Sequence, residues 1–340
     1  MTNQLFSDEQ RRLLANLAQY YGAYIDAERQ IAAQSLYRLQ WKNVSGKDYL
    51  YEIRDGRGNG SSLGPRSPET EVRHQAWLDA SERSANAKTL LTEVGRMYRA
   101  MRLGTISGEA AAILREADRR RLLGEAIIVV GTNAMPAYEV EAQCRIGTGL
   151  DETQDFDMAW IGNLILASTA SGAGRVLQNP VWSMLKAVDS TYTVNTERNF
   201  QARNAKAYEV ELLVAPSRVE SLGATDKPVP IPLPEQEWLL NGRFVDHIIC
   251  ARDGSAARVV APDPRWFALH KLWMSDQEKR DKLKRPKDRK QGERMLDSIA
   301  LYMPHYPLGD AFAAELPAEL APYLENWRAT TTVEGPQAAW

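Results

Sequence analysis

A succession of short segments between residues 126 and 214 constrains the fold more than any other part of the chain. It opens with Ile127-Ile128-Val129-Val130, a wholly apolar run of the kind expected of a buried strand. Gly131-Thr132-Asn133 follows this run directly. The elements expected after this turn are a helix over 134–142, a strand over 155–160, a helix over 180–188 and a strand over 207–214. This order predicts a mixed α/β core in the middle of the chain.

Acidic residues alternate with apolar ones on the two later strands. Asp155 and Asp157 flank Phe156, so alternation places both carboxylates on one face of the strand. Glu209 and Glu211 alternate in the same way. Neighbouring carboxylates repel each other unless a cation lies between them, and oxygen ligands suit Mg²⁺. One of the two glutamates could complete a two-metal site, although acidic residues at alternate strand positions more often form a solvated face.

The Gly131-Thr132-Asn133 turn between strand and helix has the character of a phosphate site. A small-residue turn lets backbone N–H groups approach a phosphate, and the helix N-terminus supplies partial positive charge. Many such turns contain glycine, so the turn alone is a weak signal. Its position ahead of two acidic strands is what favours a phosphate and metal site.

The segments on either side of this core are predicted to be largely helical. Ser7 and Gln10 form a capping box that starts the first helix. Strands over 41–44 and 49–53, joined by Ser45-Gly46, predict a hairpin. The other expectations are a loop over 55–68, helices over 69–102 and over 107–123 (ending at Gly124), a proline-rich connection over 216–234, and helical segments after 266.

These elements suggest a division of the chain, whose 340 residues are enough for about two domains. The predicted regions are an N-terminal helical region over 1–124 with a hairpin at 41–53, a catalytic core over 125–225, a mostly helical domain over 226–328 and a loose tail over 329–340.

Composition excludes several classes of protein. Apolar residues make up 44% of the chain, and 42 Lys and Arg against 44 Asp and Glu give a net charge of −2. A uniformly basic nucleic-acid coat and an acidic disordered chain are both excluded, and no DNA partner is predicted. Two cysteines give no disulfide framework, and the four histidines lack zinc-ligand spacing. With no long apolar stretch and no leader pattern, we expect a cytoplasmic protein without a membrane partner.

Several motifs between residues 41 and about 291 together resemble a known family. The matching pieces are Trp41…Lys47-Asp48-Tyr49-Leu50-Tyr51, Leu63-Gly64-Pro65-Arg66-Ser67, Val130-Gly131-Thr132-Asn133-Ala134…Tyr138-Glu139, Thr153-Gln154-Asp155-Phe156-Asp157, Val210-Glu211-Leu212-Leu213, Pro262-Asp263-Pro264, Phe267-Ala268-Leu269-His270-Lys271-Leu272 and Lys287-Asp288. They resemble a family of bacterial predicted nucleotidyltransferases in the DNA polymerase β-like superfamily, distantly akin to the AbiE-type and MenT-type toxin nucleotidyltransferases. The resemblance implies an α+β fold, in which a polymerase-β-like core (a small mixed sheet with helices) is flanked by N-terminal helices plus a β-hairpin and by a C-terminal helical region.

The resemblance also implies roles for residues of the core. Gly131, Thr132 and Asn133 would cradle the triphosphate of an NTP. The implied metal ligands, for Mg²⁺ or Mn²⁺, are Asp155, Asp157 and a third carboxylate, which is Glu211 by position. The turn here is Gly-Thr rather than Gly-Ser, which keeps a hydroxyl, and the third acid is Glu rather than Asp.

Three basic residues outside this core are further candidates for contacting phosphate. Lys271 and Lys287 match the family motifs, and Arg66 lies in a glycine-rich loop that could bring it over the nucleotide. The run from Glu278 to Arg294 holds nine basic residues against four acidic ones. It is either a solvated helix with ion pairs or a surface facing the site, where it would neutralise a triphosphate or an RNA backbone.

The expected activity is Mg²⁺-dependent transfer of a nucleoside monophosphate from an NTP to an acceptor hydroxyl, with release of pyrophosphate. The acceptor could be an RNA or tRNA end, a protein side chain or a small molecule. The alternative is a catalytically inactive nucleotide- or partner-binding protein of the same fold, such as a toxin-system or sensor component. Because acids fill all three metal-ligand positions, the sequence favours the enzyme.

Overall fold

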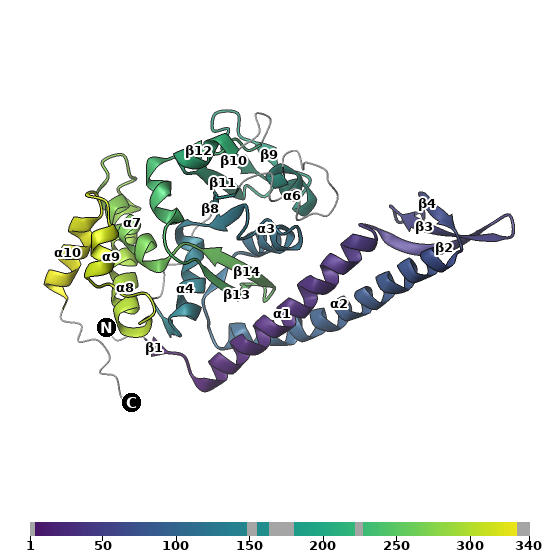
Figure 1. The fold of residues 1–340 in the computed structure, drawn as a ribbon, viewed down its shortest axis with the longest axis horizontal. Helices are drawn as coiled ribbons and strands as arrows, with labels where there is room; N and C mark the ends of the chain where they lie inside the picture. The colour runs from purple at the N-terminus through teal and green to yellow at the C-terminus, as the bar shows by residue number, and fades with distance from the viewer. Residues whose placement is uncertain (1–3, 148–154, 163–179, 222–226, 332–340) are drawn as a thin grey trace.

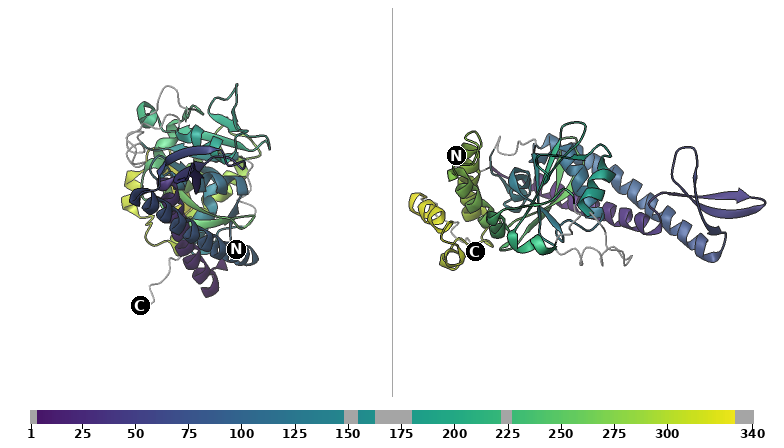
Figure 2. Two further views of the ribbon diagram at one scale, coloured as in Figure 1. Left: turned by 90° about the vertical axis from the view of Figure 1, so that its right-hand side faces the viewer. Right: turned by 90° about the horizontal axis from the view of Figure 1, so that it is seen from above.

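The chain combines helices and sheets in an α+β fold, as predicted. A computed structural model describes residues 4–147, 155–162, 180–221 and 227–331. Figure 1 shows a core of helices and sheets from which two long helices, α1 and α2, extend side by side to a small sheet at their far end. The views in Figure 2 show the same extended arm.

The central sheet is mixed and holds the acidic strands. Its strand order is β6-β8-β11-β10-β9, with β12 paired to the end of β11. Its strands are β6 (Ile127–Val129), β8 (Asp155–Trp160), β9 (Thr193–Val194), β10 (Gln201–Arg203), β11 (Glu209–Val214) and β12 (Ile231–Pro232). β8 and β11 run parallel to each other, whereas β6 and β10 run antiparallel to their neighbours. All three residues of β6 are fully buried, which confirms the interpretation of that apolar run.

A second sheet lies beside the first and was not anticipated from the sequence. It has the order β14-β13-β5 and consists of β5 (Thr105–Ile106), β13 (Val245–Ala251) and β14 (Ala256–Ala261). Residues 245–261 fall in a region expected to be mostly helical. Because most residues of β14 and of the second half of β13 are buried, these strands lack the alternation that marks a half-exposed strand.

Helices cover both sheets. The core helices are α3 (Gly108–Arg119), α4 (Met135–Glu141), α6 (Pro180–Val188), α7 (Pro264–Asp276), α8 (Arg285–Tyr302), α9 (Asp310–Glu315) and α10 (Ala321–Thr330), with 3₁₀ turns η1 (Gly131–Ala134), η2 (Pro216–Ser221) and η3 (Pro234–Leu240). α3 packs on β14, α4 packs on β13, and α7 packs along α8. Among the described helices, none is both long and apolar enough to cross a membrane.

Two predicted helix ends differ from the structure. α3 ends at Arg119, because Arg121 adopts a φ of +59° and the N–H of Leu122 bonds back to the carbonyl of Ala117 at 2.9 Å. Gly124, the expected end, has its own positive φ of +83° in the following turn. α10 continues to Thr330, so the predicted tail begins in a helix, and residues 332–340 lie outside the described part of the chain. So do residues 222–226 of the predicted connection.

The arm is built from two capped helices and a three-stranded sheet. α1 (Asp8–Gln34) begins with the predicted capping box of Ser7 and Gln10, and α2 (Pro68–Ala100) begins with a second box at Ser67 and Thr70. At 1.5 Å per residue these helices extend about 40 and 50 Å. The distal sheet consists of β2 (Arg38–Val44), β3 (Lys47–Ile53) and β4 (Gly60–Pro65). A short strand pair, β1 (Gln4–Leu5) with β7 (Cys144–Arg145), ties the start of the described chain to the core.

The distal sheet confirms the predicted hairpin and corrects the predicted loop. β2 and β3 pair through the turn at Ser45-Gly46. Residues 60–65, expected to be loop, form β4, because glycine and serine in this segment give no hydrophobic alternation for a sequence pattern to detect. Leu39, Leu50 and Ile53 are buried in this sheet, outside the large cluster of buried residues that unites the rest of the molecule.

Candidate active site

Two parallel strands bring the predicted carboxylates onto one face of the central sheet. In the register of β8 and β11, Asp155 lies opposite Glu209 and Asp157 lies opposite Glu211. Phe156 and Val210, between them in sequence, are fully buried on the other face. The alternation seen in the sequence therefore exists in both strands, and their pairing makes it a single acidic surface.

The carboxylates on this surface repel one another. The pKa of Glu211 is raised to about 7, first by burial and then by the negative charges of Asp157 and Asp155. Burial also raises the pKa of Asp157, with Asp155 adding to the shift, while Lys271, Lys284 and Arg280 oppose it. Raised carboxyl pKa values of this kind are typical of functional sites, and a bound cation would reduce the repulsion between these carboxylates.

The structure distinguishes the two glutamates. Glu209 forms an ion pair with Arg203 of β10. Glu211 forms no ion pair with the described residues, and its carboxylate accepts a hydrogen bond of 3.2 Å from the Nε2 of Gln201. The same amide nitrogen donates to Glu209 at 2.8 Å, so Gln201 fixes both side chains. Because Arg203 already neutralises Glu209, Glu211 is the better candidate for the third carboxylate.

Gly131 fits against Asp157 in a way that no other residue could. It has a φ of +71°, and a Cβ at this position would lie 2.5 Å from the Oδ2 of Asp157. The N–H of Val130 donates to the backbone carbonyl of Asp157 at 3.1 Å, which holds the turn against β8. The predicted glycine turn is therefore in direct contact with the acidic strand.

The two residues after Gly131 are buried and fix the turn in place. The amide of Asn133 donates to the carbonyl of Asp155 at 3.0 Å. The hydroxyl of Thr132 accepts from the Nε2 of Gln291, on α8, at 3.3 Å. In this structure both side chains therefore hold the turn between β8 and α8.

Basic residues from α7 and the segment before α8 lie beside the carboxylates. Lys271 is buried, and its Nζ donates to the Oδ1 of Asp288 at 2.9 Å. Arg280 donates to the other oxygen of Asp288 at 2.7 Å. Lys284 reaches Asp155 directly, with 3.2 Å between its Nζ and Oδ2. Asp288 thus holds the side chains of Lys271 and Arg280 near the acidic surface, and Lys284 contacts that surface directly.

Of the individually predicted basic residues, Lys271 is the one that the structure brings to the carboxylates. Arg280 and Lys284 were named only as members of the basic run and Asp288 only within the motif Lys287-Asp288, and Gln201 had no predicted role. Lys287 lies in the first turn of α8, beside Asp288. The basic run from Glu278 to Arg294 was expected either to face the site or to be a solvated helix, and Lys284 and Arg280 support the first of these. The sequence signal for Asp288 is its place in the motif Lys287-Asp288, within that run.

The structure does not bring Arg66 to this site. It follows β4 of the distal sheet, where it pairs with Asp48 at 3.4 Å and Glu71 at 2.8 Å, and its guanidinium lies over the ring of Trp41. Figure 1 shows this sheet at the far end of the arm. The glycine-rich segment before Arg66 is a strand of the distal sheet rather than the predicted loop, so this structure gives no support to a place for Arg66 over the nucleotide.

The carboxylates of the acidic surface are candidate ligands for a divalent cation. Within the described residues, no three Asp, Glu, His or Cys side chains converge into a ready-made metal site. The acidic surface nonetheless offers only carboxylate oxygens, which are the ligands that Mg²⁺ and Mn²⁺ prefer. Lys284 supplies positive charge at Asp155. The donor chemistry fits such an ion, which would compete with Lys284 for Asp155.

Comparison with known proteins assigns a family to the part of the chain that holds this site. A family model described as Nucleotidyltransferase matches residues 108–317, which is more than half of the chain. The match contains the turn at Gly131, the three carboxylates and the basic segment. No curated protein and no solved structure matches the chain. The chain therefore belongs to this nucleotidyltransferase family, a class of enzymes that transfer a nucleoside monophosphate group from a nucleoside triphosphate.

Proposed function

We propose that the protein transfers a nucleoside monophosphate from an NTP to an acceptor hydroxyl in a reaction that depends on Mg²⁺ or Mn²⁺. The observation that carries this proposal is the pairing of β8 with β11, which places Asp155, Asp157 and Glu211 on one surface against Gly131. The same arrangement of a glycine turn and three acids underlies the resemblance to the polymerase-β-like core.

The reaction is an in-line displacement at the α-phosphorus. The acceptor oxygen forms a bond to that phosphorus, the bond to the bridging oxygen of the β-phosphate breaks, and pyrophosphate leaves while the hydroxyl proton is released to solvent. Asp155 and Asp157 would hold the metal ions, with Glu211 joining on the acceptor side. When bound, these ions would neutralise charge on the attacking and leaving oxygens.

The residues around the acidic surface would position the triphosphate. Gly131 leaves room for a phosphate to approach the backbone of the turn, since no side chain intervenes. Lys284 is half-exposed and would turn from Asp155 to the phosphates when an ion replaces it. Lys271 and Arg280, held by Asp288, provide fixed positive charge beside the leaving group.

Labelled nucleotides test this proposal. NTPs carrying ³²P at the α-position are incubated with the purified protein and a cell extract, with Mg²⁺ or with EDTA. We expect label to pass to an acceptor only when the metal is present. Label at the γ-position should be released as pyrophosphate. Transfer of the γ-label would contradict monophosphate transfer and indicate phosphoryl transfer instead.

Matched variants connect this activity to the acidic surface. Asp157→Ala and Glu211→Gln should abolish transfer, whereas Glu209→Gln, on the same surface but neutralised by Arg203, should retain most of it. Thermal unfolding of each variant controls for folding. Transfer that survives Asp157→Ala would overturn the assignment of the site. Absence of Mg-NTP binding in calorimetry would oppose the catalytic proposal altogether.

A further inference from the structure

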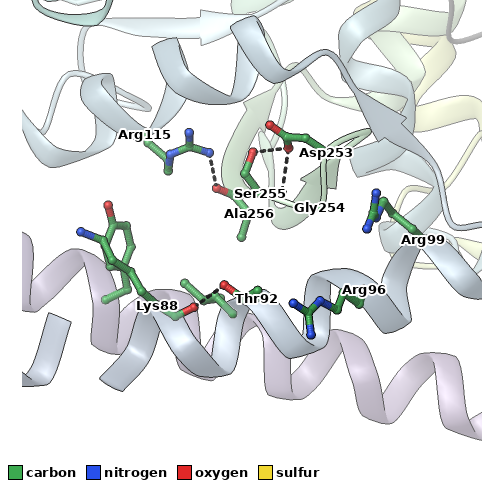
Figure 3. Close-up of a pocket in the computed structure, with 11 residues that line it drawn as sticks. Lys88, Thr92, Arg96, Arg99, Arg115, Asp253, Gly254, Ser255 and Ala256 are labelled. Atoms are coloured by element: carbon green, nitrogen blue, oxygen red, sulfur yellow. Dashed lines mark hydrogen bonds between the residues drawn. The ribbon is translucent and has the colours of Figure 1, made fainter. Parts of the chain in front are cut away.

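A basic hollow lies between the arm and the core, with no residue of the acidic surface in its lining. It has a volume of about 540 Å³ and is lined from α1, α2, α3 and the turn between β13 and β14. Figure 3 shows Lys88, Arg96 and Arg99 on α2, Arg115 on α3, and Asp253 in the turn, arranged around the open space. Four cationic side chains thus surround a hollow in which Asp253 is the acidic lining residue.

Close contact between two backbones forms this hollow. A Cβ on Gly95 of α2 would lie 2.1 Å from the carbonyl oxygen of Gly254, which itself has a φ of +88°. Only glycine at position 95 allows the β13–β14 turn to sit so near the helix. The turn is fixed by Asp253, whose carboxylate accepts from the N–H of Ser255 at 2.8 Å and from its hydroxyl at 2.6 Å.

Among the described residues, no carboxylate forms an ion pair with the arginines of the hollow, although the charge of Arg115 helps to lower the pKa of Asp253. Arg115 donates to the carbonyl of Ala256 at 3.1 Å, and Arg99 donates to the carbonyl of Arg252 at 3.4 Å. The side chain of Arg96 makes no hydrogen bond or ion pair with any residue that the structure describes. Carbonyl contacts orient a guanidinium but leave its positive charge in place, so three like charges face one space. An anion in that space would relieve their repulsion and could be bound by the paired N–H groups that arginine presents to phosphate.

The opposite end of the hollow is different in character. Tyr24 and Leu91 line it, and the Nζ of Lys88 lies 5.3 Å from the centre of the Tyr24 ring. Lys88 also pairs with Glu28 at 3.2 Å, which reduces its charge. This end therefore offers an aromatic ring and an apolar side chain next to the arginines.

We propose that this hollow is a second ligand site, which binds a phosphorylated small molecule of nucleotide size. Its phosphate groups would be held by Arg96, Arg99 and Arg115, and its ring or apolar body would pack against Tyr24 and Leu91. The volume lies within the range that small-molecule sites commonly have. The site is separate from the acidic surface and needs no divalent cation.

Binding without metal provides the test. Calorimetry is carried out on the full chain in EDTA at low salt, with pyrophosphate, ATP, adenosine and a single-stranded RNA of about ten nucleotides as probes. We expect ATP and pyrophosphate to bind, adenosine to bind at least tenfold more weakly than ATP, and affinity to fall with added salt. Asp157→Asn, which should abolish transfer, should bind ATP in EDTA as the unchanged protein does.

Variants of α2 locate the binding. The double variant Arg96→Gln with Arg99→Gln should weaken ATP binding at least tenfold, whereas Arg83→Gln, an exposed arginine on the same helix, should leave it unchanged. Because the side chain of Arg96 makes no hydrogen bond or ion pair with the described residues, Arg96→Gln alone serves if the double variant does not fold. Equal binding by the Arg96 variants, or no binding of ATP and pyrophosphate by the unchanged protein, would overturn the proposal. Binding of RNA alone would also overturn it, in favour of a surface for a nucleic-acid acceptor.

Discussion

Gly131 joins backbone geometry to the chemistry of the site. Its positive φ and its contact with Asp157 act together, since a side chain there would both strain the backbone and push on a carboxylate. The sequence predicts a phosphate-binding turn at this residue. The structure adds that the turn also determines where the carboxylate of Asp157 can lie.

Replacing Gly131 tests this coupling. We expect Gly131→Ala to reduce transfer at least a hundredfold and to cost about 1–3 kcal/mol of stability, because the new Cβ meets Asp157. Gly22→Ala in α1, where a Cβ has no neighbour within 4 Å, should leave activity intact and stabilise the protein slightly. Activity assays and thermal unfolding of both variants provide the comparison. Unimpaired transfer by Gly131→Ala would separate the turn from the site.

Glu211 should make the stability of the metal-free protein depend on pH. Its pKa is about 7 in the folded protein and 4.5 ordinarily, so the folded state disfavours its charged form. The resulting destabilisation is absent below pH 4.5, grows as the pH rises toward 7, and is constant above it.

The corresponding prediction concerns Glu211→Gln. In EDTA this variant should be more stable than the unchanged protein at pH 8, by about 1–3 kcal/mol, and equally stable near pH 4.5. Added Mg²⁺ should stabilise only the unchanged protein. Thermal unfolding across this pH range measures the difference. A variant that is less stable at pH 8 would show that Glu211 is not destabilised by its neighbours.

Elements that depend on local sequence patterns were predictable, whereas the pairing of strands was not. The capping box at Ser7, the apolar run of β6 and the alternation in β8 and β11 depend on residues adjacent in sequence, and each appears as expected. The register between β8 and β11 depends on two strands that are about fifty residues apart. No local pattern specifies that Asp157 faces Glu211.

The elements missed from the sequence have a common cause. β4 is mostly glycine and serine, with Leu63 too isolated to alternate, and β13 and β14 are buried too thoroughly to alternate, so none of them shows the period of a strand. Asp288 was missed because its partners, Lys271 and Arg280, are set by the packing of α7 against α8. The candidate role of Arg66 followed from the interpretation of β4 as a loop, whereas the structure places Arg66 beside Asp48 and Glu71.

A further prediction concerns Lys284, in the segment before α8. Lys284→Ala should raise the KM for the NTP about tenfold, equivalent to about 1.4 kcal/mol, because Lys284 supplies charge at Asp155 and then at the phosphates. Lys282→Ala, an exposed neighbour in the same basic run, should change the KM less than twofold. Steady-state kinetics at saturating Mg²⁺ measures both. An unchanged KM for Lys284→Ala would place the triphosphate elsewhere.

In the whole molecule, the near-zero net charge conceals a separation of charge. The carboxylates of β8 and β11 face a basic segment from α7 and α8, and Lys284 bridges the two at Asp155. A second basic concentration lies where the arm meets the core. The near-equal totals of 42 basic and 44 acidic residues therefore include separate concentrations of each sign.

The distal sheet lies at the far end of the arm, away from the acidic surface (Figure 1). Arg66→Ala should leave the KM for the NTP within twofold and change stability by less than about 1 kcal/mol, because its ion pairs with Asp48 and Glu71 are exposed. Kinetics with the NTP as the varied substrate checks this. An increase in KM above fivefold would mean that the distal sheet folds back to the active site during the reaction.

Direct observation of the metal is the sharpest test of the proposed active site. Crystals soaked with Mn²⁺ and a non-hydrolysable NTP analogue would locate the ion by anomalous scattering. We predict a manganese peak ligated by Asp155, Asp157 and Glu211, with the triphosphate against Gly131 and Lys284 released from Asp155. A nucleotide bound with its metal away from β8 and β11, or held by Glu209 in place of Glu211, would contradict this account.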